Sequence, residues 1–302
     1  MIDAISCPPG SSAFFLHAWQ RQPIVYKDFF SKEEVAQHNK IAEWCESPTT
    51  ARLFTRHEES LPGSAKSRIV PSPREALSLY QKYCETSELT LLLNNIEQRD
   101  PSLRDMQRRF AIPHDWRFDD VVATLSSKGG GIGYHAGYED GFIVQLRGSR
   151  RWRVWSSEHL TMQFRRSILG DDSFARPDWS RTEAAPLIDC ILEPGDAMYT
   201  PTLFPHEGTT IAESISLSLA WRGISAYEVL VEIGKLTNVT YFTSPSEAPD
   251  ELFVIVPDPC PSSDAGAEIT QSLIQIFKCL DGNVPHDRII RIYVDSMLET
   301  RV

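Results

Sequence analysis

The stretch GGGIGYHAGYEDGFIVQLRGSRRWRVW, residues 129–155, is the part of the chain from which the fold can be predicted. Four closely spaced glycines precede His135, and short runs of β-branched and aromatic residues follow it. Such runs are typical of strands in an antiparallel sandwich or barrel. The glycines match neither a Rossmann nor a P-loop pattern, so we expect them to let the backbone approach a cofactor or substrate closely.

The strand pattern extends from Pro113 to about residue 223. It recurs in DDVVATLS (119–126), LIDCILEPGDAMYTP (187–201) and SISLSLAWRG (214–223). In the last segment serine alternates with isoleucine or leucine, which places the hydroxyl groups on one face of the strand and the apolar side chains on the other. The pattern predicts a mainly β domain.

Helical patterns lie on both sides of the strand region. Residues 31–34 and 72–75 both have the S-x-x-E form of a capping box, which marks a helix N-terminus. Residues 90–110 also show a helical pattern, which Pro101 divides into two helices. The helical period returns after about residue 226. We therefore expect helical decoration before the strands and a helical region after them.

Composition excludes several classes of protein. The 302 residues are 41% hydrophobic and 24% charged, as in an ordinary globular protein. A net charge of −11 argues against a nucleic-acid-binding face. The six cysteines form no CxxC pair, so neither a zinc knuckle nor a redox dithiol is indicated. The N-terminus has no signal-peptide pattern and no window resembles a membrane span, which predicts a cytoplasmic protein.

Two histidines are candidate metal ligands. His135 follows the glycine run, and His206 lies in a loop that Pro201 and Pro205 stiffen. A neutral imidazole offers a ring nitrogen to a metal ion. The segment between the two histidines is long enough for several strands, so they can meet across a barrel.

The order of several motifs resembles the Jumonji-C, or cupin-type, ribosomal-protein hydroxylases, especially the bacterial arginyl hydroxylase branch. The motifs are WRFDD (116–120), GGGIGYH (129–135), FIVQ (142–145), GSRRWRV (148–154), LEPGDAMYTP (192–201) and FPHEG (204–208). FLHAWQRQPIVYKDFF near the N-terminus and the C-terminal helices resemble the same branch. The resemblance therefore covers most of the chain.

The resemblance implies a double-stranded β-helix, the jelly-roll cupin fold, that holds Fe(II) at its mouth through His135 and His206. The co-substrate 2-oxoglutarate would chelate the iron, and Arg150 matches the base that pairs with its distal carboxylate. A guanidinium suits this task because it grips a carboxylate in bidentate fashion and keeps its charge. Ser218, on the last barrel strand, is a further candidate residue near the cofactor.

The chain departs from the family at Gly137. Where active hydroxylases have His-x-Asp, it has His135-Ala136-Gly137, and glycine offers no ligand atom. The 2-His-1-carboxylate triad leaves positions open for 2-oxoglutarate and O2. Three interpretations follow: a halogenase in which chloride fills the vacated site, a hydroxylase with a substitute ligand, and a non-catalytic cupin scaffold.

Glu139 and Asp140 are the nearest acids for a substitute ligand. Strand parity puts Glu139 on the side of His135, although its backbone lies about 6 to 7 Å further along the strand. Asp140 matches an acid that the family already has besides its metal-binding Asp, and we expect it to form hydrogen bonds within the site.

Our main hypothesis from the sequence is an Fe(II)- and 2-oxoglutarate-dependent halogenase, with Gly137 making space for chloride. Residues 1–223 would form the catalytic domain with its N-terminal helices, and residues 224–302 a helical region that is a candidate surface for homodimerisation. The latter region is too short for the winged-helix domain that the ribosomal hydroxylases commonly carry. We therefore expect an amino acid, a peptide or a small natural product as substrate.

Overall fold

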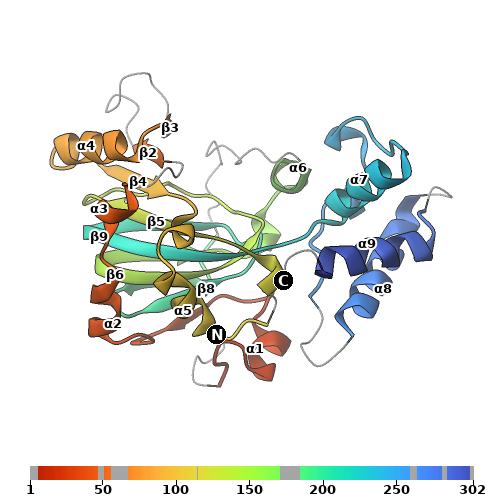
Figure 1. The fold of residues 1–302 in the computed structure, drawn as a ribbon, viewed down its shortest axis with the longest axis horizontal. Coiled ribbons are helices and arrows are strands. Elements are labelled where there is room, and N and C mark those ends of the chain that lie inside the picture. The colour runs from red at the N-terminus through yellow and green to blue at the C-terminus, as the bar shows by residue number, and fades with distance from the viewer. Residues whose placement is uncertain are drawn as a thin grey trace.

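The structure is a computed structural model that describes residues 6–46, 51–55, 67–113, 115–170, 184–258, 264–280 and 284–299. Within these residues nine strands form one antiparallel sheet in the order β1-β8-β6-β9-β5-β4-β2-β3, with β7 paired to β6 (Figure 1). The strands are β1 (Ile24–Tyr26), β2 (Ala51–Thr55), β3 (Ser67–Val70), β4 (Leu89–Leu93), β5 (Phe118–Ser126), β6 (Glu139–Val154), β7 (Ile188–Leu192), β8 (Ala197–Thr200) and β9 (His206–Arg222). The α-helices are α1 (Ser12–His17), α2 (Lys32–Gln37), α3 (Ile41–Trp44), α4 (Pro73–Tyr83), α5 (Ser102–Arg108), α6 (Met162–Gly170), α7 (Ala226–Thr237), α8 (Ala265–Phe277) and α9 (Asp287–Glu299).

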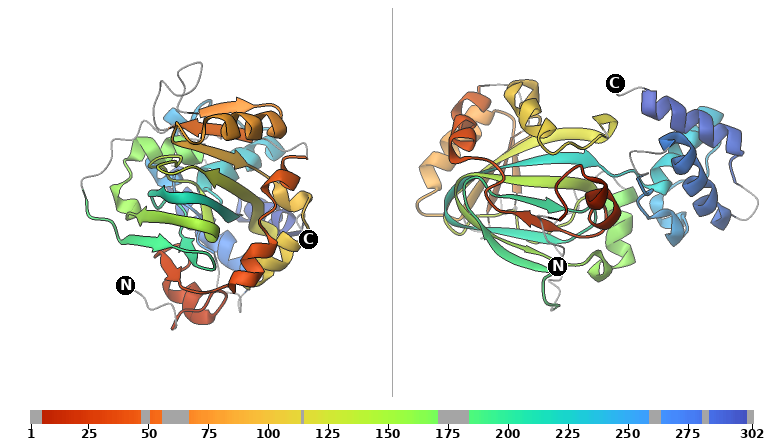
Figure 2. Two further views of the ribbon diagram at one scale, coloured as in Figure 1. Left: turned by 90° about the vertical axis from the view of Figure 1, so that its left-hand side faces the viewer. Right: turned by 90° about the horizontal axis from the view of Figure 1, so that it is seen from below.

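Two long strands, β6 and β9, organise the sheet. They pair along almost their whole lengths, from Glu139 opposite Arg222 to Val154 opposite His206. The register shifts near the middle of β6, and such irregularities bend a strand. On one side of the bend β6 also pairs with β8, and on the other side with β7. The sheet thereby curls into a jelly roll (Figure 2), which confirms the predicted mainly β cupin fold.

Residues 90–110 were expected to be helical throughout, and this expectation is wrong for the first of them. Leu89–Leu93 forms β4, which lies between β2 and β5 in the sheet and is buried along its whole length. A short apolar run without polar alternation fits a strand covered on both faces as well as a buried helix. The second predicted helix is present as α5, directly after Pro101.

Both predicted capping boxes mark real helix starts. The Ser31 hydroxyl accepts a hydrogen bond from the backbone N–H of Glu34 (3.1 Å), and the Glu34 carboxylate accepts one from the N–H of Ser31 (2.7 Å). This reciprocal pair begins α2. Ser72 caps α4 by accepting from the N–H of Glu75 at 3.3 Å, with Pro73 in the first turn. Local sequence therefore determines these two helix boundaries.

The three C-terminal helices α7, α8 and α9 pack through their apolar faces beside the barrel (Figures 1 and 2). Leu230, Leu273 and Ile290 contribute to their shared core, which also includes Ala136 and Leu203 from the barrel loops. Within the described residues, none of the helices combines the length and apolarity needed to cross a bilayer. A domain boundary at residue 223 and a homodimer remain predictions.

Candidate metal and cofactor site

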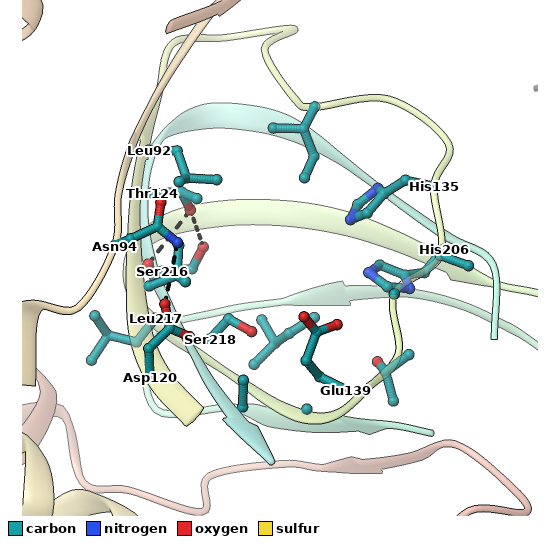
Figure 3. A pocket seen from close by; sticks show the side chains of 18 of the residues that line it. Leu92, Asn94, Asp120, Thr124, His135, Glu139, His206, Ser216, Leu217 and Ser218 are labelled. Atoms are coloured by element: carbon teal, nitrogen blue, oxygen red, sulfur yellow. Dashed lines mark hydrogen bonds between the residues drawn. The ribbon is translucent and has the colours of Figure 1, made fainter. Parts of the chain in front are cut away.

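The candidate site is a cavity of about 360 Å³ inside the jelly roll. His135, Glu139 and His206 lie around one part of it, whereas Thr124 and Ser216 lie at the other (Figure 3). Apolar side chains, among them Ile143 and Leu217, also line the cavity. Further residues of the lining are Asn94, Asp119, Asp120, Arg150, Trp152, Thr200 and Ser218. The cavity is therefore lined by both polar and apolar side chains, and the histidines and Glu139 lie apart from Thr124 and Ser216 (Figure 3).

The two histidines face each other across an antiparallel bridge. The backbone N–H of His135 donates to the carbonyl of His206 at 3.0 Å, and that of His206 donates back at 2.7 Å. Their ring centroids lie 4.3 Å apart, and both rings point into the cavity (Figure 3). Because the backbone fixes both Cα positions, the sequence-predicted pair is brought together by the sheet itself.

Hydrogen bonds at Nδ1 orient both imidazoles. Nδ1 of His135 lies 2.9 Å from the carbonyl oxygen of Gly133, and Nδ1 of His206 lies 2.9 Å from that of Phe204. A proton on each Nδ1 satisfies these carbonyls and leaves Nε2 with a lone pair directed at the cavity. Metal-ligating histidines commonly donate their other ring N–H in this way.

Burial keeps both imidazoles neutral. It lowers the pKa of His206 to about 4. It lowers the pKa of His135 well below its ordinary value, and the neighbouring His206 adds to this effect. The neutral form is the one that binds a metal ion, so the electrostatics of the pocket suit ligation.

Arg150 is buried, with 2% of its surface exposed. Its guanidinium donates to the hydroxyls of Thr124 (3.2 Å) and Ser216 (3.4 Å) and to the carbonyl of Gly208 (3.4 Å). It also lies over the ring of Trp152, with 4.8 Å from its central carbon to the ring centroid. These contacts fix a permanent positive charge in the cavity wall, where it can grip a carboxylate.

Glycine is needed beside this guanidinium. A Cβ on Gly208 would stand 2.7 Å from Nε of Arg150 and 2.9 Å from the ring of Trp152. A Cβ on Gly131, in the glycine run, would overlap the carbonyl oxygen of Gly208. Gly131 therefore allows a close approach to the segment that follows His206, whereas the expected approach of the glycine run to a cofactor or substrate stays a prediction.

The space beside Gly137 holds the side chain of Glu139. A Cβ built on Gly137 would overlap Oε2 of Glu139, whose carboxylate points towards the two imidazoles (Figure 3). Burial raises the pKa of Glu139 to about 7. Across the part of the chain that the structure describes, no three His, Cys, Asp or Glu side chains are already gathered tightly enough to hold a metal ion. The two histidines and Glu139 are thus neighbours without forming a closed ligand set in this conformation.

The other two predicted site residues lie differently. Asp140 is fully buried on the opposite face of β6, where its carboxylate accepts hydrogen bonds from the hydroxyl of Tyr199 (2.5 Å) and the backbone N–H of Thr202 (3.3 Å). It is not among the residues that line the cavity, so its hydrogen bonds are made outside the cavity and not within it as expected; a catalytic role of Asp140 stays a prediction. Ser218 lines the cavity, but the serine that contacts Arg150 is Ser216.

Residues 105–229 match the family model described as the JmjC domain. The chain is also 29% identical over 220 residues to the ribosomal protein uL16 3-hydroxylase of Escherichia coli, covering 72% of this chain and 54% of that protein. It is 27% identical to a probable ribosomal oxygenase of Haemophilus influenzae, covering 69% of this chain and 48% of the relative. It thus spans about half the length of these curated relatives.

Solved structures support the same fold. The Escherichia coli ribosomal oxygenase YcfD superposes with a TM-score of 0.55 at 25% identity, over 91% of this chain and 67% of that chain. A structure of YcfD in complex with cobalt and 2-oxoglutarate gives a TM-score of 0.57 at 23% identity, over 94% of this chain and 69% of that chain. The JmjC match and these superpositions establish a JmjC cupin fold for the strand region.

Proposed function

We propose that this protein is an Fe(II)- and 2-oxoglutarate-dependent oxygenase that hydroxylates a side chain of a protein or peptide. The observation that carries the proposal is the bridged pair His135 and His206 in the same cavity as the buried guanidinium of Arg150. The two imidazoles are candidate ligands for a metal ion, and the guanidinium is a candidate partner for the distal carboxylate of 2-oxoglutarate. The ribosomal oxygenases that the chain resembles support the reaction and the substrate class.

The side chains of the cavity have the chemistry that Fe(II) and 2-oxoglutarate require. Two neutral imidazoles with oriented Nε2 atoms suit Fe(II), which accepts imidazole and carboxylate ligands. Arg150 would hold the distal carboxylate of 2-oxoglutarate, with Thr124 and Ser216 fixing the plane of the guanidinium. The bound iron, 2-oxoglutarate and O2 would supply the oxidation of a substrate C–H bond. The apolar side chains of the cavity wall would keep bulk water away from the reacting groups.

The geometry favours hydroxylation over halogenation. The halogenase hypothesis requires the space beside Gly137 to hold a chloride ion. That space is taken by the side chain of Glu139, so a halide could enter only after this side chain had moved. The relatives described above are oxygenases and hydroxylases, and none of them supports chloride as a cofactor.

Binding of 2-oxoglutarate provides the first test. The protein is titrated with 2-oxoglutarate in the presence of Fe(II) without oxygen, beside the variant His206→Ala and the control His159→Ala, whose exposed ring lies outside the cavity lining. We expect metal-dependent binding in the wild type and the control and its loss in His206→Ala. If the wild type binds neither iron nor 2-oxoglutarate, the protein is a scaffold and the proposal is wrong.

Turnover provides the second test. The protein is incubated with Fe(II), 2-oxoglutarate, oxygen and chloride together with peptides of ribosomal proteins, and products are measured by mass spectrometry. A peptide that gains one oxygen atom supports hydroxylation. A product that gains chlorine, or a bromide ion found beside Gly137 by anomalous scattering, restores the halogenase hypothesis.

A further inference from the structure

We propose that Glu139 supplies the third protein ligand to the metal ion, in place of the carboxylate that residue 137 lacks. The inference rests on the proposed function, because it concerns the same metal site. It assigns the site a His-His-Glu set in which the acid lies four residues after the first histidine instead of two.

The first argument is the position of the Glu139 carboxylate. Oε2 of Glu139 lies so close to the ideal Cβ position of residue 137 that the two atoms would overlap. A glutamate two residues further along the strand thus delivers its carboxylate to the space that a shorter acid at 137 would use. The two side chains would compete for this space. The observed orientation of Glu139 therefore depends on the absence of a side chain at residue 137.

The second argument is the alternation of β6. Glu139 opens this strand opposite Arg222, and its side chain turns towards the cavity. Asp140, the next residue, therefore turns away and is held by Tyr199. Strand parity makes Glu139 the acid of β6 that can reach the histidines.

The third argument concerns the other acids of the cavity. Asp120 accepts a hydrogen bond from the side-chain amide of Asn94 at 3.2 Å and lies across the cavity from the histidines (Figure 3). Asp119 is largely exposed to solvent. Within the described lining, Glu139 is the acid whose carboxylate points towards the imidazoles (Figure 3). Three rotatable bonds in its side chain allow it to close on a metal ion that His135 and His206 already hold.

A rescue experiment tests the assignment. Anaerobic Co(II) titrations are made on the wild type, Glu139→Ala, the double variant Glu139→Ala/Gly137→Asp, and the control Asp119→Asn. Gly137 does not have a positive φ, and the three heavy atoms nearest to a Cβ at this position all belong to Glu139, so removing that side chain makes room for the new aspartate. Melting temperatures show whether each variant is folded.

We expect Glu139→Ala to bind Co(II) at least about 10-fold more weakly while remaining folded, with a changed visible Co(II) spectrum, because loss of even an outer-shell partner of a metal ligand typically costs about 10- to 100-fold. The double variant should regain both affinity and spectrum, and Asp119→Asn should match the wild type. If Glu139→Ala binds Co(II) as tightly as the wild type, the assignment is wrong but the proposed function stands. The same holds if Asp119→Asn loses as much Co(II) affinity as Glu139→Ala. If the wild type itself does not bind the metal ion, the proposed function fails together with the assignment.

Discussion

Nε of Arg150 lies 2.7 Å from the point at which a Cβ on Gly208 would stand. Gly208 is two residues after His206 on β9, and Trp152, which lies opposite Gly208, packs under the same guanidinium. Strand β9 thus carries both His206, a candidate metal ligand, and Gly208. The absence of a side chain at Gly208 leaves space for Arg150, the candidate anchor for 2-oxoglutarate. Changes at Gly208 should therefore affect co-substrate binding without removing any ligand atom.

The first prediction concerns Gly208→Ala. The added methyl group would press on Arg150 and on the ring of Trp152, and overpacking of this kind typically costs about 1 to 3 kcal/mol. We expect a lower free energy of unfolding in urea and weaker binding of 2-oxoglutarate by calorimetry.

The matched control is Gly141→Ala, at a glycine of the cavity lining. A Cβ there would have Ser218 Oγ at 3.8 Å as its nearest neighbour, an ordinary van der Waals contact. This variant should unfold like the wild type. Equal losses in both variants would show that the cavity tolerates no added methyl group and that Gly208 has no special relationship to Arg150.

The second prediction concerns Arg150→Lys. Lysine keeps the positive charge but loses the planar fork that holds a carboxylate through two parallel hydrogen bonds. Hydrogen bonds to charged groups contribute about 1.5 to 3 kcal/mol, so 2-oxoglutarate should bind about 10- to 100-fold more weakly. Calorimetric titration of the metal-loaded protein measures this.

Arg151→Lys is the control for the same strand. Arg151 is exposed, on the outer face of β6, and pairs with Asp189 at 2.6 Å. Its replacement should leave the affinity for 2-oxoglutarate unchanged. If Arg150→Lys binds 2-oxoglutarate as tightly as the wild type, the anchor is another residue.

Much of the fold could be predicted from the sequence because its signals are local. Alternation defines the strand that contains Ser214, Ser216 and Ser218, and capping residues define α2 and α4. The sequence does not predict β4 because this short, mostly apolar run lacks the regular polar alternation of a half-exposed strand. Sequence spacing also correctly predicts that His135 and His206 meet.

The rest of the site depends on register, which the sequence does not show. Thr124 lies opposite Ser216 in the pairing of β5 with β9, and only this pairing brings both hydroxyls to Arg150. Strand parity indicates Glu139, but its backbone lies about 6 to 7 Å further along the strand than that of residue 137. The orientation of its side chain, which only the folded chain shows, brings the carboxylate back towards Gly137.

The third prediction concerns the pH dependence of stability at Asp120. Burial raises the pKa of this carboxyl to about 6, against an ordinary value of 3.8. Between about pH 4 and 6 the folded protein therefore keeps a proton that the unfolded chain releases. Its contribution to stability is largest below about pH 4 and falls as pH rises to about 6, by on the order of 3 kcal/mol.

Urea unfolding at several pH values measures this effect as a difference between the wild type and Asp120→Asn. The variant should lack the decline between about pH 4 and 6 and should keep the other pH dependence of the protein. Asp119→Asn, which changes the exposed neighbour, is expected to retain the decline. A wild-type curve parallel to that of Asp120→Asn would contradict the raised pKa.

The fourth prediction concerns the buried ion pair between Arg117 and Asp258, whose side chains are 1% and 0% exposed. Asp258 also accepts a hydrogen bond from Nε1 of Trp19 at 2.8 Å, and its backbone N–H donates to Gln20 at 3.1 Å. It thus joins the segment between α7 and α8 to the N-terminal part of the chain. Removing one partner of a buried pair leaves an uncompensated charge, so Asp258→Ala should lower the free energy of unfolding by about 3 to 5 kcal/mol.

An exposed ion pair in the same region provides the comparison. Asp250 pairs with Arg166, and the Asp250 side chain is 56% exposed. Because solvent screens such a pair, Asp250→Ala should cost less than about 1 kcal/mol. Urea unfolding of both variants decides the matter: similar small losses would mean that the C-terminal segment is held by apolar packing, with no large contribution from the charges of Arg117 and Asp258.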